Sequence, residues 1–239
     1  MSASAQATLE RLRGKLIVSC QAAPGTPLEP TAHIVALARS VVLGGAQGLR
    51  IEGATNVRAV RDAVRVPIIG IVKAQHPGSE AFITTQVAEV DELADAGADM
   101  IAFDATDRPR PVPIEEVVAA IQRRGRPAMA DISTLNEARH AIDVAANVVG
   151  TTLAGYTNYS SALKGPDFRL MEELAIEGLP FFAEGRIWTP GEAARCISLG
   201  AMFVVVGSAI TRPDDIARRY AEAVESAAEE RPLVLQRGD

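Results

Sequence analysis

The chain has 239 residues, and its 24 lysine and arginine residues against 30 aspartate and glutamate residues give a formal net charge of −6. Hydrophobic residues make up 48% of the chain and charged residues 23%, a composition that excludes an intrinsically disordered protein. Because general nucleic-acid binders carry a net basic surface, the acidic balance argues against that class. The two cysteines, Cys20 and Cys196, are far apart in the sequence and indicate neither a zinc site nor a disulfide framework.

The N-terminal segment and the most apolar stretch of the chain bear on where the protein acts. Residues 1–15 are polar and charged and lack the apolar core of a secretory signal. The most apolar uncharged stretch, residues 196–211, is too short to span a bilayer and is interrupted by glycine and serine. We therefore expect a cytoplasmic protein that has no membrane partner and acts on a small molecule.

Eight short apolar runs alternate along the chain with longer stretches of helical periodicity. Each run is almost continuously apolar, which is typical of strands buried on both faces of a parallel sheet. The predicted strands are residues 15–19, 48–51, 67–72, 100–103, 127–130, 147–151, 180–183 and 202–206.

The amphipathic stretches between these runs predict helices. The clearest ones cover residues 87–96, 114–123, 134–145 and 190–199. Ser133 or Thr134 begins one of them and Thr189 begins another, because a hydroxyl there can accept hydrogen bonds from the free N–H groups of the first turn. Gly97 and Gly200 follow helical stretches and favour the left-handed conformation that ends a helix.

Eight strand–helix units in a chain of this length predict an α/β fold, a (β/α)8 TIM barrel in one domain over residues 1–239. The alternative is a doubly wound open sheet, whose nucleotide-binding form is weakened because no Gly-x-Gly-x-x-Gly motif follows the first strand. No linker or low-complexity run divides the chain, and the polar residues 229–239 predict a frayed tail.

The predicted loops after the seventh and eighth strands carry the features of an anion site. In TIM barrels these loops, at the C-terminal ends of the strands, often bind phosphate. Gly185 and Gly207 would let the backbone approach an anion closely, while Ser208 and Arg212 offer a hydroxyl and a guanidinium donor. We predict a barrel of the phosphate-binding type, with ordinary tight turns as the alternative interpretation.

Lys73 and Glu184 each end a predicted strand at the same rim of the barrel. Desolvation there would lower the pKa of the lysine, which could then act as a general base, a Schiff-base nucleophile or a plain cation. The alternative interpretation is a solvated lysine at the end of a strand. Glu184 could exchange protons with substrate or hold a neighbouring arginine. Asp131 could orient a hydroxyl or a lysine, and Asp104 could stabilise its own loop. His76 has no second histidine beside it, so no metal site is predicted.

Several segments resemble successive motifs of the N-acetylmannosamine-6-phosphate 2-epimerase family, in order along nearly the whole chain. They are IVSCQ (17–21), GIVK (70–73), FDAT (103–106), RPRP (108–111), MADIST (129–134), GTTLAGYT (150–157), AEGRI (183–187) and VGSAITRP (206–213). The resemblance implies interconversion of N-acetylmannosamine 6-phosphate and N-acetylglucosamine 6-phosphate in amino-sugar or sialic-acid catabolism, with no cofactor. It also favours a homodimer, as do exposed apolar helix residues.

Carried over position by position, the resemblance implies roles for individual residues. Lys73 and Glu184 match the catalytic pair. The positions implied to contact the sugar are Gln21, Arg50, Asp131 and Arg186, and those at the phosphate end are Gly185, Gly207, Ser208 and Arg212. Independently of the resemblance, Tyr156 is predicted to shape the mouth of the site and to contact the substrate. The chain departs from the family pattern at Ile51-Glu52 and at residues 74–77, near the reacting end.

Two other functions are compatible with these residues. One is a Schiff-base aldolase that acts on a phosphorylated sugar acid, with Lys73 as the nucleophile. The other is a barrel that binds sugar phosphates without catalysis.

Overall fold

A computed structural model describes residues 3–229 of the chain, with side chains from residue 5. Eight parallel strands form a closed barrel in sequence order, and β8 pairs with β1 through Val18 and Val206 to close it. The strands are β1 Leu16–Cys20, β2 Gly48–Glu52, β3 Ile68–Ile71, β4 Met100–Asp104, β5 Ala128–Asp131, β6 Val148–Gly150, β7 Phe181–Glu184 and β8 Val204–Val206. The predicted (β/α)8 TIM barrel is confirmed, and each strand lies within one or two residues of its predicted run.

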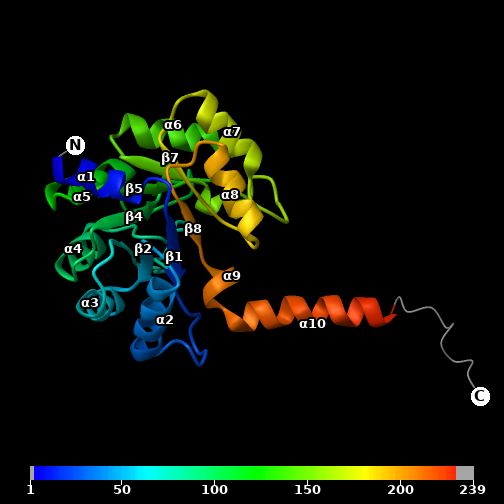
Figure 1. The fold of residues 1–239 in the computed structure, drawn as a ribbon. Helices are drawn as coiled ribbons and strands as arrows, with labels where there is room; N and C mark the ends of the chain where they lie inside the picture. The colour runs from blue at the N-terminus through cyan, green and yellow to red at the C-terminus, as the bar shows by residue number, and fades with distance from the viewer. Residues whose placement is uncertain (1–2, 230–239) are drawn as a thin grey trace, which may run out of the picture.

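Helices surround the barrel and connect its strands (Figure 1). They are α1 Ala3–Leu12, α2 Thr31–Leu43, α3 Ala54–Ala63, α4 Val87–Asp95, α5 Ile114–Arg123, α6 Leu135–Asp143, the 3-10 helix η1 Thr151–Leu153, α7 Phe168–Ile176, α8 Pro190–Ser198, α9 Ser208–Thr211 and α10 Pro213–Glu229. The predicted caps are confirmed for α6 and α8, where the hydroxyls of Thr134 and Thr189 each accept a hydrogen bond from the first turn. Gly97 and Gly200, with φ of +96° and +102°, follow α4 and α8 as predicted.

The barrel interior is filled by apolar side chains. Within this interior cluster, the rings of Phe182 of β7 and Phe203 stack with centroids 5.2 Å apart. Gly150 of β6 makes room for them, since a Cβ at this position would lie 1.7 Å from Cζ of Phe182. Leu9 and Leu12 of α1 are buried in the same apolar cluster, so this helix packs on the interior core.

Helix α10 projects away from the barrel (Figure 1), and none of its residues is buried. A groove of about 430 Å³ runs along the outside of β8, beside α8. It is lined largely by apolar side chains, among them Leu16, Ile197, Val204 and Ile210. The last helix of the barrel therefore does not cover the last strand. Of the predicted frayed tail, only Glu229, the last residue of α10, lies within the described residues.

Candidate active site

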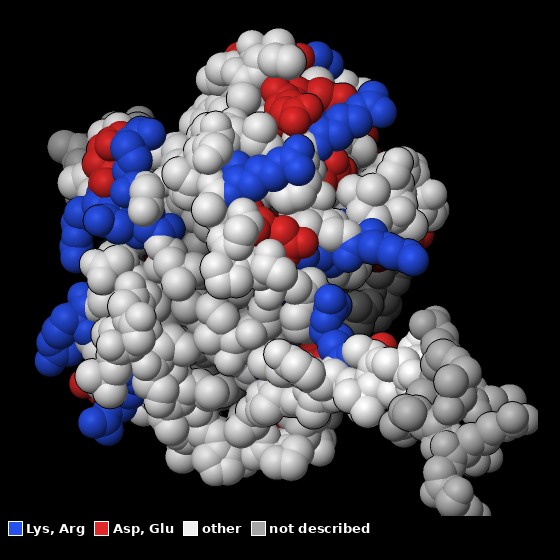
Figure 2. Space-filling model, turned by 45° about the vertical axis from the view of Figure 1, so that its right-hand side comes forward, with Lys and Arg blue, Asp and Glu red and all other residues white. Residues whose placement is uncertain are grey.

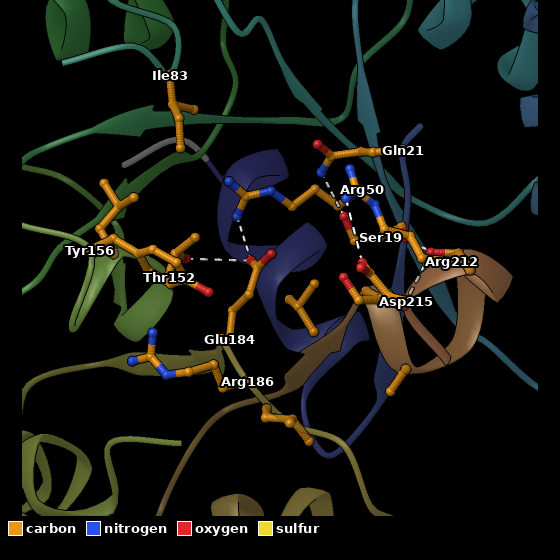
Figure 3. Close-up of a pocket in the computed structure, with 18 of the residues that line it drawn as sticks. Ser19, Gln21, Arg50, Ile83, Thr152, Tyr156, Glu184, Arg186, Arg212 and Asp215 are labelled. Atoms are coloured by element: carbon orange, nitrogen blue, oxygen red, sulfur yellow. Dashed lines mark hydrogen bonds and ion pairs between the residues drawn. The ribbon is translucent and has the colours of Figure 1, made fainter. Parts of the chain in front are cut away.

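A cavity of about 490 Å³ opens at the C-terminal ends of the strands, where catalytic sites of TIM barrels lie (Figure 3). The structure brings ten of the predicted site residues to its wall: Gln21, Arg50, Lys73, Tyr156, Glu184, Gly185, Arg186, Gly207, Ser208 and Arg212. The exception is Asp131, which is fully buried and lies behind the wall.

Arg50 is the central cation of this site. It is 1% exposed, and its Nη1 and Nη2 atoms donate to the two carboxylate oxygens of Asp131 at 3.1 and 2.5 Å. Nη1 also donates to Oε2 of Glu184 at 2.5 Å. Burial alone would lower the pKa of Arg50, but the two carboxylates outweigh it and raise this pKa above its ordinary value. Arg50 is therefore a permanent, fixed positive charge.

Glu184 ends β7 with only 13% of its side chain exposed. Burial, and next to it the negative charge of Asp131, disfavour its ionised form, while Arg50 and Lys73 favour it. The net effect raises the pKa of Glu184 to about 7. A carboxyl group with such a pKa can both donate and accept a proton near neutral pH.

Lys73 stands two residues beyond the end of β3, in a segment held by an antiparallel bridge to Ile83. Its side chain is exposed where it lines the cavity. Even so, protein atoms partly desolvate the ammonium group, and this effect, followed by the positive charges of Arg50 and Arg212, lowers the pKa of Lys73. Glu184 attracts the ammonium and opposes the shift. The two groups predicted to form a catalytic pair thus share one cavity.

Two predicted sugar contacts are held by neighbours. The amide of Gln21 donates to Oγ of Ser19 at 2.6 Å. The guanidinium of Arg186 lies over the ring of Tyr156, 4.7 Å from its centroid, and donates to the backbone carbonyls of Ala154 and Gly165. Arg186 therefore forms part of the cavity wall on the Tyr156 side, as Figure 3 shows.

Arg212 and Asp215, which follow β8, lie on the side of the cavity away from Tyr156 (Figure 3), and Gly185 of the loop after β7 also lines the cavity. Gly185 has φ of +108°, and a Cβ there would lie 3.4 Å from two backbone carbonyl oxygens. This position therefore needs glycine. Arg212 pairs with Asp215 of α10 at 3.6 Å, and both side chains line the cavity beside Ser208.

Sequence reasoning did not single out Ser19 and Asp215, and it gave Thr152, in the GTTLAGYT segment after the sixth strand, no role of its own. Ser19, Thr152 and Asp215 line the cavity and bond to Gln21, Asp131 and Arg212 respectively. For Asp215 the only signal is its spacing from Arg212, three residues along a helix start. Asp104, by contrast, accepts hydrogen bonds from Thr106 and Arg108 in its own loop and does not line the cavity.

Two further features bear on the predicted partners. Among the described residues, no group of three His, Cys, Asp and Glu side chains is placed to hold a metal ion. No helix over the same residues combines the length and the apolar character needed to cross a bilayer.

The fold and the cavity define a TIM barrel with a mixed-charge pocket at the C-terminal end of its strands, the place of barrel active sites. The family model described as "Putative N-acetylmannosamine-6-phosphate epimerase" matches residues 34–226. The chain belongs to this family.

Individual proteins similar to the chain agree with this assignment. The "Putative N-acetylmannosamine-6-phosphate 2-epimerase" of Edwardsiella ictaluri is 45% identical over 90% of this chain and 91% of its own. The solved N-acetylmannosamine-6-phosphate 2-epimerase of Clostridium perfringens has a TM-score of 0.88 and 42% identity, over 90% of this chain and 95% of that one. The "Bifunctional enzyme NanE/NanK" of Brucella melitensis is 49% identical over 95% of this chain, which spans only 44% of that protein.

Proposed function

We propose that this chain interconverts N-acetylmannosamine 6-phosphate and N-acetylglucosamine 6-phosphate by removing and returning the proton at C2. The observation that carries the proposal is the pairing of Lys73 with Glu184 in one cavity, where partial desolvation lowers the pKa of the lysine and burial raises that of the glutamate. The resemblance of the chain to proteins named for this reaction supports the same substrate. A phosphorylated amino sugar is then the partner of the site.

The chemistry starts from the open-chain sugar, in which the C2 proton is α to the C1 aldehyde. Its removal creates an enolate, so a base must accept the proton while a positive charge stabilises the developing charge on the C1 oxygen. Lys73 and Glu184 exchange this proton with C2. Proton transfer beside a carbonyl needs neither a hydride carrier nor an electron sink, and we therefore propose a reaction without a cofactor.

Arg50 supplies a fixed positive charge within this pocket. Because Asp131 holds its guanidinium in two hydrogen bonds, the charge is oriented before substrate arrives and needs no rearrangement as negative charge develops. We propose that Arg50, Gln21, Tyr156 and Arg186 contact the sugar. Asp131 acts from behind the wall by holding Arg50 in place.

At the far end, Gly185, Gly207 and Ser208 form the proposed phosphate site together with Arg212. The guanidinium of Arg212 is 31% exposed and its contact with Asp215 is a loose 3.6 Å, so it is free to donate to a phosphate. A phosphate held far from C2 provides binding energy that orients the reacting carbon.

The function is tested by incubating the purified protein with N-acetylmannosamine 6-phosphate and following the sugar resonances by NMR. We expect N-acetylglucosamine 6-phosphate to form without loss of carbon atoms. Cleavage of the sugar and trapping of Lys73 by borohydride would instead identify a Schiff-base aldolase. Saturable binding without any change of the sugar would identify a binding protein.

We also propose that the protein is a homodimer in which α10 of one copy covers the groove beside β8 of the other. Ile216, Tyr220 and Val224 recur every four residues and so share one face of α10, and Tyr220 and Val224 are 73% and 67% exposed. The groove is lined largely by apolar side chains, and α10, the last helix of the described residues, does not cover it. The central lower part of the face in Figure 2, next to the start of α10, carries few charged side chains.

Sedimentation of the protein and two variants tests this assembly. We expect a dimer for the wild type and for Glu225→Ala, which lies on the opposite face of α10. Tyr220→Asp places a charge in the proposed contact and should yield monomers. A monomeric wild type would contradict the exchange of helices and favour closure of α10 on its own barrel. We further propose that the protein acts in the cytoplasm on free phosphosugars, without a nucleic-acid or membrane partner.

A further inference from the structure

The hydroxyl of Thr152 stands between two carboxylates at the wall of the cavity. Thr152 belongs to η1, the single turn that follows β6. Its Oγ1 atom lies 2.6 Å from Oδ1 of Asp131 and 3.4 Å from Oε2 of Glu184. Figure 3 shows its side chain directed at the Glu184 carboxylate.

The same two carboxylate oxygens are also bridged by Arg50. Its Nη1 atom donates to Oδ1 of Asp131 at 3.1 Å and to Oε2 of Glu184 at 2.5 Å. The guanidinium of Arg50, the hydroxyl of Thr152 and the carboxylates of Asp131 and Glu184 therefore form a closed ring of contacts. Asp131 is fully buried and cannot turn to water for another partner.

We propose that Thr152 is a positioning residue that, by donating its hydroxyl to Asp131 beside Glu184, keeps Glu184 ionised and directed into the cavity near neutral pH. This inference rests on the proposed C2 proton transfer, in which an ionised Glu184 is the form that can accept the C2 proton.

Loss of the hydroxyl acts on Glu184 in two ways that have the same sign. The single hydroxyl hydrogen goes to Asp131 at 2.6 Å, so the Asp131 carboxylate becomes less neutralised, and an apolar group in place of the hydroxyl removes water from the Glu184 carboxylate. The other charged groups around Glu184 are Arg50 and Lys73, and Arg50 already donates to both carboxylates. Both effects favour the protonated form of Glu184.

The variants Thr152→Val and Thr152→Ser separate the hydroxyl from the shape of the side chain. Carbon-13 NMR of glutamate carboxyl groups, with the Glu184 signal identified by its loss in Glu184→Gln, reports the titration directly. We expect the pKa of Glu184 to rise by about one unit in Thr152→Val. Thr152→Ser should restore the wild-type titration.

Thr151→Val is the matched control. The Thr151 hydroxyl donates to the backbone carbonyl of Glu184 at 2.9 Å, so its loss should lower stability and leave the carboxylate titration in place. An unchanged or lowered Glu184 pKa in Thr152→Val would overturn the proposal and leave Thr152 a structural residue.

The same variants are then assayed for deuterium uptake at C2 across pH. In Thr152→Val, the acid limb of the pH–rate profile should shift to higher pH by the same amount as the NMR titration of Glu184. KM should change little. If the wild-type protein shows no C2 exchange, the proposed function fails, whereas the NMR titration still decides the role of Thr152.

Discussion

Nη1 of Arg50 lies 2.5 Å from Oε2 of Glu184, although the two residues are 134 positions apart in the chain. They belong to β2 and β7, which are not neighbours in the barrel, and meet across its mouth. A buried cation thus joins one strand to the carboxylates of two others, Asp131 and Glu184. This contact links the stability of the barrel to the chemistry of its rim.

Replacing Arg50 with methionine should destabilise the protein. It leaves Asp131 buried and unpaired, and removing one partner of a buried ion pair typically costs about 3–5 kcal/mol. The free energy of unfolding in urea measures the loss. Arg58→Ala, at an exposed position of α3, is the control and should change stability by less than about 0.5 kcal/mol. An equally small effect for Arg50→Met would show that water reaches Asp131.

The catalytic pair is tested by Lys73→Ala and Glu184→Gln. Each removes a group that exchanges a proton with C2, and general acid–base catalysis typically contributes about 10²–10⁴-fold to the rate. We expect kcat to fall within this range while circular dichroism stays that of the wild type. Lys164→Ala, at an exposed loop position, should keep full activity. Full activity in either catalytic variant would remove that residue from the mechanism.

The pH dependence of kcat/KM should be bell-shaped. Transfer in either direction needs one proton on the Lys73–Glu184 pair, whichever of the two groups carries it. Because the pKa of Glu184 is raised to about 7, the rate should rise with pH up to that region, as the second proton leaves the pair. It should fall again at a pH below the usual lysine value of about 10.4, because the pKa of Lys73 is lowered.

The substrate phosphate titrates near pH 6 and would overlap the acid limb. Unphosphorylated N-acetylmannosamine, which has no such group, should show the same limb near pH 7 at a lower rate. An acid limb that disappears with this sugar belongs to the phosphate and would contradict a role for Glu184.

Arg212→Ala tests the phosphate end. Hydrogen bonds to charged groups contribute about 1.5–3 kcal/mol, so KM for the phosphorylated sugar should rise about 10-fold to 100-fold with a smaller change in kcat. For N-acetylmannosamine the variant and the wild type should have equal kcat/KM. Equal losses with both sugars would place Arg212 outside the phosphate site.

Gly150→Ala tests the packing of the barrel interior. Its Cβ would fall 1.7 Å from the Phe182 ring, which is confined by its stack on Phe203. Overpacking of this kind typically costs about 1–3 kcal/mol, and thermal unfolding measures it. Gly191→Ala, where the nearest atom outside its neighbours lies at 4.0 Å, should be close to neutral.

The strands were predictable because buried parallel strands are almost continuously apolar, and every predicted run became a strand. The direction of α10 was not predictable from the sequence. The amphipathic pattern of Ile216, Tyr220 and Val224 indicates that one face of the helix is apolar, but not which surface that face packs against. Similarly, the position of Asp131 behind the wall depends on Arg50 reaching across the barrel. A strand end indicates which rim a side chain lies on, while its partners depend on long-range contacts.

Proton NMR of the reaction in D2O tests the central claim most directly. With N-acetylmannosamine 6-phosphate and wild-type protein, we expect the H2 resonance to disappear as deuterium enters C2, together with the appearance of N-acetylglucosamine 6-phosphate. Conversion to that product with the original C2 hydrogen retained throughout would contradict an exchange of protons among Lys73, Glu184 and solvent.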